Sequence, residues 1–145
     1  MTTTDVQTAA VPTRPARRDG LTLAAAVSLL VITVLHTAVF APHPWWQAWL
    51  AGPFRTDPLP ADALVQFWGL PGGFVVPGAL LSLLILAAGR RGSTVPGYVG
   101  WVLALWALVC LWIVGPSGFV LLLVPATLLI LAAARAPRGG ASNAR

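Results

Sequence analysis

The amino-acid sequence predicts an all-α membrane protein with four transmembrane helices in an antiparallel bundle. Hydrophobic residues make up 57% of the chain and charged residues only 9%, whereas about 25% of the residues in soluble domains are charged. Three long stretches, 21–50, 63–89 and 92–134, contain no Asp, Glu, Lys or Arg. A soluble protein of this length could not bury so much apolar surface. We therefore expect a multi-pass protein of the cell membrane.

Four apolar segments are each long enough to cross the bilayer as a helix, because about 20 residues span roughly 30 Å of hydrocarbon. Their apolar residues run continuously and do not alternate, which argues against a transmembrane barrel. The flanking segments 1–20 and 135–145 are rich in small and polar residues, and we expect them to be disordered tails. The predicted spans are 21–41, 63–88, 95–114 and 117–134.

The arginines orient these four spans, since cytoplasmic loops carry an excess of basic residues. With four spans, Arg55 alone falls on the outer side, beside Asp57 and Asp62. Both termini are therefore predicted to be cytoplasmic. The remaining arginines all fall on the other side: Arg14, Arg17, Arg18, Arg90, Arg91, Arg135, Arg138 and Arg145.

The first outer loop carries a short tryptophan-rich helix. Trp45, Trp46 and Trp49 fall on one face of a helix that starts at Pro44 and ends near Gly52. Tryptophan prefers the membrane interface, so we interpret the three as an interfacial anchor. The alternative is a lid over a pocket that contains His36.

The second span contains FWGLPGGFVVPG, residues 67–78, where prolines remove helical hydrogen bonds and glycines remove side chains. Gly69 and Gly73 form a G-x-x-x-G pair, which allows close helix packing. A kinked, closely packed helix is the favoured interpretation. The alternative is a broken helix whose freed carbonyls line a cavity. The packing or kink residues are Gly69, Pro71, Gly72, Gly73, Pro77 and Gly78.

His36 is an ionisable residue well inside the first span, and such residues are candidates for function because leaving them unpaired is costly. A structural role is the alternative: a neutral imidazole hydrogen-bonded across the bundle, with Gln66 of the second span as a suggested partner. The candidate polar pocket consists of His36, Thr33, Thr37 and Gln66.

The sequence GPSG predicts a tight turn between the third and fourth spans. Gly115 can take the left-handed conformation that closes a helix, Pro116 prevents its continuation, and Ser117 before Gly118 can cap the next helix. Spans three and four should therefore form an antiparallel hairpin.

No catalytic, cofactor or metal site is predicted. Pro42 separates His36 from His43, and no intramembrane carboxylate or second cysteine accompanies Cys110. Trp101, Trp106 and Trp112 are interpreted as lipid-facing or core aromatics. Because the arginines flank apolar spans, nucleic acid is not an expected partner. The bilayer is, with a membrane protein or a second copy of the chain as further possibilities.

Four segments together resemble a bacterial family of small integral membrane proteins known as a domain of unknown function. The resemblance covers residues 21–134 and rests on LHTAVF, FWGLPGGFVVPG, VPGYVGWVLALWALVC and PSGFVLLLVPATLLILA, in this order. It implies four membrane helices and an intact hairpin, and it implies no activity.

Three functional classes follow from these observations. The favoured one is a non-catalytic accessory or partner-binding membrane component, consistent with few polar groups and close-packing glycines. The second is a small oligomeric transporter or pore that uses a pocket near His36, which could carry a proton near neutral pH. The third is a quinone-linked oxidoreductase component, for which His36 and Cys110 are the available side chains.

Overall fold

A computed structural model describes residues 19–136, which are helical apart from short connections. Four of its helices are long and apolar enough to cross a membrane, which confirms the predicted number of spans. The predicted tails lie almost entirely outside the described residues. The four helices are Gly20–Phe40, Ala61–Arg90, Gly97–Val114 and Gly118–Arg135, each within a few residues of its predicted bounds.

The second and fourth spans are composite, and the outer loop contains two short helices. In chain order the elements are α1 (Gly20–Phe40), α2 (Trp45–Leu50), the 3₁₀ turn η1 (Gly52–Phe54), α3 (Ala61–Gly69), the π-helical turn η2 (Pro71–Val75), α4 (Val76–Arg90), α5 (Gly97–Val114), the 3₁₀ turn η3 (Gly118–Leu122) and α6 (Leu123–Arg135).

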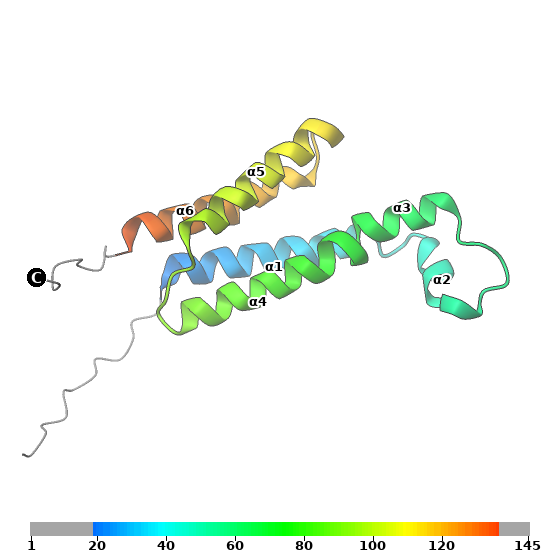
Figure 1. The fold of residues 1–145 in the computed structure, drawn as a ribbon, viewed down its shortest axis with the longest axis horizontal. Coiled ribbons are helices and arrows are strands. Elements are labelled where there is room, and N and C mark those ends of the chain that lie inside the picture. The colour runs from blue at the N-terminus through cyan, green and yellow to red at the C-terminus, as the bar shows by residue number, and fades with distance from the viewer. Residues whose placement is uncertain (1–18, 137–145) are drawn as a thin grey trace, which may run out of the picture.

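Successive spans run in opposite directions, and both ends of the described chain lie at the same end of the molecule (Figure 1). The helices pack in the order α4, α1, α6, α5, so α1 contacts both α4 and α6 while α5 packs against α6. The small buried residues Ala25 and Ala26 allow α1 to approach a helix on each side. We call this arrangement a layer, with α4 and α5 at its edges. The two edges approach each other at one place, where the rings of Phe74 in η2 and Trp106 in α5 lie 5.8 Å apart between centroids.

Glycines bring the helices together at the end of the layer that carries Arg90 and Arg135, here called the inner end. A Cβ on Gly89 of α4 would lie 3.0 Å from the Leu23 side chain of α1. On Gly100 of α5 it would lie 2.8 Å from Ile130 of α6. A side chain at Gly100 would collide with the backbone of α6, and one at Gly89 would require Leu23 to shift, so both helix pairs pack closely here.

The opposite, outer end of the layer is splayed. The α5–α6 hairpin diverges from α1 and α4 toward its turn (Figure 1). Gly115 ends α5 with a positive φ of 83°, which suits glycine, but its ψ of −167° lies outside the left-handed helical region predicted for it. The hairpin turn consequently stands away from α1, and the space between them is the site described below.

The break in the second span lies between Gly69 and Val76. Leu70 has a non-helical backbone (φ −114°, ψ −100°), and Val75 N–H donates to the Leu70 carbonyl at 2.7 Å, the i→i+5 spacing of a π-helix. A Cβ on Gly73 would lie 1.9 Å from the Trp68 carbonyl oxygen, so this turn requires glycine. Pro77 stands in the first turn of α4, where proline is tolerated.

Candidate ligand pocket beside His36

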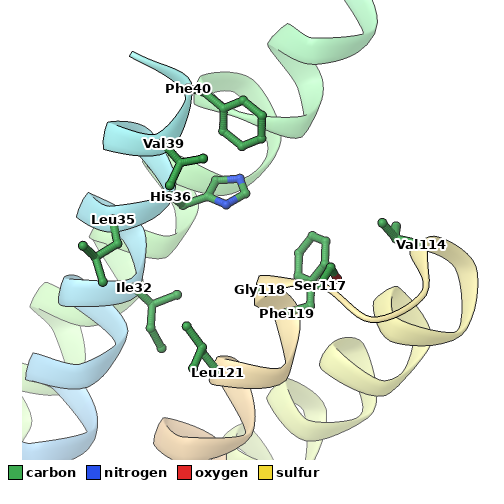
Figure 2. Close-up of a pocket in the computed structure, with 10 residues that line it drawn as sticks. All are labelled: Ile32, Leu35, His36, Val39, Phe40, Val114, Ser117, Gly118, Phe119 and Leu121. Carbon is green, nitrogen blue, oxygen red and sulfur yellow. The ribbon is translucent and has the colours of Figure 1, made fainter. Parts of the chain in front are cut away.

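A cavity of about 370 Å³ separates α1 from the turn of the α5–α6 hairpin (Figure 2). This volume falls within the range of roughly 300–1,000 Å³ that is usual for small-molecule pockets. The cavity lies between the first and fourth spans, whereas the sequence suggested a pairing of the first with the second. It is lined by Ile32, Leu35, His36, Val39, Phe40, Val114, Ser117, Gly118, Phe119 and Leu121.

His36 is one of two polar residues in this lining, and its side chain is half-buried. Its Nε2 lies 3.4 Å from the carbonyl oxygen of Gly69, the last residue of α3. Carbonyls in the last turn of a helix need partners from outside the helix. Because a carbonyl oxygen can only accept, Nε2 carries the proton of this long hydrogen bond. In a neutral imidazole, Nδ1 is then an acceptor.

Three phenyl rings surround the imidazole and come from three different elements. The ring of Phe74 in η2 is 4.7 Å away between centroids, that of Phe40 in α1 is 5.4 Å away, and that of Phe119 in η3 is 6.3 Å away. The sequence analysis did not identify these phenylalanines. The contact with Phe40 could have been predicted from the sequence, since Phe40 follows His36 by four residues and therefore lies on the same face of the helix.

Ser117 is the second polar residue of the cavity lining. It occupies the N-cap position of η3, but its hydroxyl makes no capping hydrogen bond, so the predicted cap does not form. Its Oγ is buried and has no hydrogen-bond partner within residues 19–136. Buried hydroxyls are normally hydrogen-bonded, and an unsatisfied one costs about 1–3 kcal/mol.

The other members of the predicted polar pocket do not line the cavity. Thr33 is 2% exposed, donates to the Leu29 carbonyl at 2.9 Å, and would lie 2.9 Å from a Cβ on Gly78. Thr37 donates to the Thr33 carbonyl at 3.0 Å. Thr33 therefore serves the close packing of α1 on α4. The hydrogen bond of His36 goes to the Gly69 carbonyl and not to Gln66.

The glycines of the second span divide between packing and backbone geometry. A Cβ on Gly69 would meet nothing within 4 Å, while one on Gly72 would lie 2.7 Å from the Phe67 ring of its own span. Within residues 67–78, the close approach to α1 is at Gly78. The segment thus has a close packing contact at Gly78, as in a kinked helix, and a Gly69 carbonyl that is bonded by His36, as in a broken helix.

The three tryptophans of α2 are held by the protein through their indole N–H groups. Trp45 Nε1 donates to Asp62 at 3.3 Å, Trp46 Nε1 to the Phe40 carbonyl at 3.1 Å, and Trp49 Nε1 to the Ala63 carbonyl at 2.8 Å. The predicted short helix is therefore present and joins the end of α1 to the start of α3. The large apolar side chains that this loop exposes most are Leu50 and Phe54, at 83% and 92%.

A second groove of about 450 Å³ continues from the cavity along α1 and α6. The two share Ile32, Leu35 and Leu121. The groove is otherwise lined by Ala24, Val27, Ser28, Val31 and Val124. The cavity and the groove are therefore adjacent along α1 and α6, and the two polar residues of the cavity lie at the outer end.

Residues singled out for other chemistry lie apart from this site. Within residues 19–136, no three His, Cys, Asp or Glu side chains come together as a metal site. Trp101 and Trp112 are 65% and 90% exposed, as expected of side chains that face lipid. Trp106 is 40% exposed and packs against Phe74, with 5.8 Å between ring centroids.

Comparison with protein-family models, with curated proteins and with solved structures found no match. The resemblance of residues 21–134 to a family of small bacterial membrane proteins therefore stays a prediction. The functional argument for this chain rests on the geometry of the site.

Proposed function

We propose that this protein is a non-catalytic accessory component of the cell membrane that holds a small molecule in the cavity between α1 and the α5–α6 turn. This proposal rests on one observation: the cavity combines apolar walls with two polar side chains, His36 and Ser117. Small-molecule sites in proteins are predominantly apolar, with a few polar groups that fix the ligand's orientation. We infer that the ligand reaches the site from the bilayer.

The exposure of the lining residues supports lateral access. Leu35, Val39 and Val114 line the cavity and are 53%, 71% and 62% exposed. If both termini are cytoplasmic, as the arginines predict, the cavity lies toward the outer leaflet. We also propose that α2 lies at the outer interface, with Leu50 and Phe54 in contact with lipid.

The cavity of about 370 Å³ has the size usual for small-molecule sites, and an extended chain or a small ring system matches it.

Two neighbouring substitutions on α1 test this proposal. Leu35 lines both the cavity and the groove, whereas Val34 lines neither and is similarly exposed, at 59%. Leu35→Trp should fill the cavity, and Val34→Trp should place the same side chain in lipid.

Native mass spectrometry of the gently extracted protein then compares the bound small molecules. We expect them in the wild type and in Val34→Trp, and a loss of most of them in Leu35→Trp. Equal occupancy in the two variants would contradict the proposal, as would a wild type free of small molecules.

A second candidate function is lateral association with another membrane helix. The observation in its favour is the edge of the layer, where α5 packs against α6 and leaves Trp101, Leu105 and Trp112 exposed. The same mass spectra test it, because a stoichiometric partner or a second copy would appear as a separate mass. Transport of the bound molecule is a third possibility, and it predicts a flux into liposomes that Leu35→Trp abolishes.

A further inference from the structure

We propose that the ligand of the His36 cavity is a single-chain amphiphile with an uncharged hydroxyl head, such as a long-chain alcohol. This inference rests on the proposed function and names its ligand class. The hydroxyl would bind between His36 and Ser117, and the chain would follow the groove along α1 and α6.

The polar end of the site offers one acceptor and one hydroxyl. His36 Nε2 is engaged by the Gly69 carbonyl, while no hydrogen bond reaches Nδ1 within residues 19–136. Ser117 Oγ likewise lacks a partner there. A ligand hydroxyl can donate to Nδ1. It can also accept from the serine O–H once the serine side chain turns toward the cavity, because Ser117 Oγ is buried in the structure. One group with both roles therefore satisfies both residues.

The apolar part of the site fits one hydrocarbon chain. The groove extends from Leu35 and Leu121 along α1 as far as Ala24. From Ala24 to His36 the helix rises roughly 18 Å at 1.5 Å per residue. This length suits an extended chain of lipid size. The groove and cavity are open to the surrounding bilayer, so the chain can enter without unfolding of the layer.

The charges of the described chain argue for an uncharged head. Arg90, Arg91 and Arg135 lie at the inner end of the layer, away from the cavity. In the outer loop, Arg55 donates to the Gly52 carbonyl, and Asp57 and Asp62 carry negative charge. A phosphate or carboxylate head would find no cation in the cavity lining.

Two matched probes test the head group: hexadecanol and its methyl ether, each radiolabelled. The ether keeps the chain and the oxygen acceptor but cannot donate a hydrogen bond. Binding of each probe is measured as partitioning into phosphatidylcholine nanodiscs that contain the full-length protein, relative to empty nanodiscs. We expect the alcohol to bind roughly fivefold more tightly than the ether, the contribution of about one hydrogen bond.

Two variants separate the roles of the polar residues. His36→Phe keeps a ring among the phenylalanines but removes Nδ1, and we expect it to abolish the preference for the alcohol. Ser117→Ala removes a hydroxyl that makes no hydrogen bond in the structure, so the fold should be unaffected. Ser117→Ala should weaken the binding of the alcohol and of the ether by the same factor, because serine donates to the oxygen that both probes contain. Thr127→Ala, on the exposed side of α6, is the control and should change neither.

Each result separates the ligand class from the pocket itself. Preference for the alcohol in the wild type and its loss in His36→Phe support the inference. Equal binding of both probes, blocked by Leu35→Trp but not by Val34→Trp, would leave the pocket standing and overturn the hydroxyl head. Binding of neither probe above the level of empty nanodiscs, by a protein that also carries no small molecule when extracted, would overturn the inference and the proposed function together.

Discussion

The inner and outer ends of this helix layer are built from the same two hairpins, and yet they pack differently. At the inner end, Gly89 and Gly100 let neighbouring helices pack closely. A Cβ at these positions would lie 3.0 Å and 2.8 Å from the nearest atom of the neighbouring helix. At the outer end, large aromatic side chains replace glycines between α1, η2 and η3, and a cavity of about 370 Å³ stays open. Small residues allow close packing of membrane helices, whereas rings hold them apart.

The comparison also separates two uses of polar groups. At the inner end the Thr22 hydroxyl donates to the Asp19 side chain, and Asp19 N–H donates to the Gly89 carbonyl at 3.2 Å. The first bond is local to the start of α1, and the second joins it to the end of α4. At the outer end Ser117 Oγ and His36 Nδ1 stay available. Unused hydrogen-bonding groups in apolar surroundings are the feature that distinguishes a site from a scaffold.

The largest effect should come from a methyl group at the inner contact. Gly100→Ala places Cβ 2.9 Å from the Ala126 carbonyl oxygen, so backbone atoms must move. We expect a loss of about 3 kcal/mol in the free energy of unfolding. The control is Gly118→Ala at the hairpin turn, where a Cβ meets nothing within 4 Å. Unfolding in mixed micelles measures both, and equal stabilities would contradict tight inner packing.

A smaller difference should separate two leucines of α1. Leu29 is 1% exposed in the core, and Leu35 is 53% exposed beside the cavity. Leu29→Ala should cost about 2 kcal/mol, since the cavity it leaves removes packing contacts even where lipid replaces water as solvent. Leu35→Ala should cost well under about 1 kcal/mol, because an open cavity already adjoins it. The same unfolding titration measures both losses in the free energy of unfolding. A larger loss for Leu35→Ala than for Leu29→Ala would contradict this expectation.

The smallest effects concern two serines, and they should have opposite signs. Ser82 is buried in α4, and its hydroxyl donates to the Gly78 carbonyl at 2.7 Å. Ser82→Ala should therefore cost about 0.5 kcal/mol, the usual value for such bonds in membrane proteins. Ser117→Ala should leave the ligand-free protein equally stable or up to about 1 kcal/mol more stable, because an unsatisfied hydroxyl is removed. A clear loss of stability in Ser117→Ala would show that its hydroxyl has a partner in the native protein.

The sequence predicted the four spans well because hydropathy and length alone determine which segments can cross a bilayer. It also predicted the short α2 helix, the closure of α5 at Gly115 and the irregular backbone between Gly69 and Val76, since proline and glycine act locally. These features depend on a few neighbouring residues, which one sequence contains.

The walls of the cavity could not be predicted in the same way. Whether His36 meets Gln66 or the Gly69 carbonyl depends on the rotation of α3 about its axis, which the backbone break changes. Ser117 occupies the N-cap position of η3 but makes no capping hydrogen bond, an outcome that the GPSG motif alone does not determine. The order of the helices, with α1 between α4 and α6, likewise follows from packing over the whole layer.

The break in the second span fixes His36 with Nδ1 free to accept a hydrogen bond in an open cavity. Nitrogen NMR of the imidazole tests this most directly, because the chain contains two histidines and His43→Gln leaves His36 alone. We predict the tautomer with the proton on Nε2, and a shift of the Nδ1 resonance when hexadecanol is added to the nanodiscs. A proton on Nδ1, or an Nδ1 resonance that hexadecanol leaves unchanged, would contradict the account.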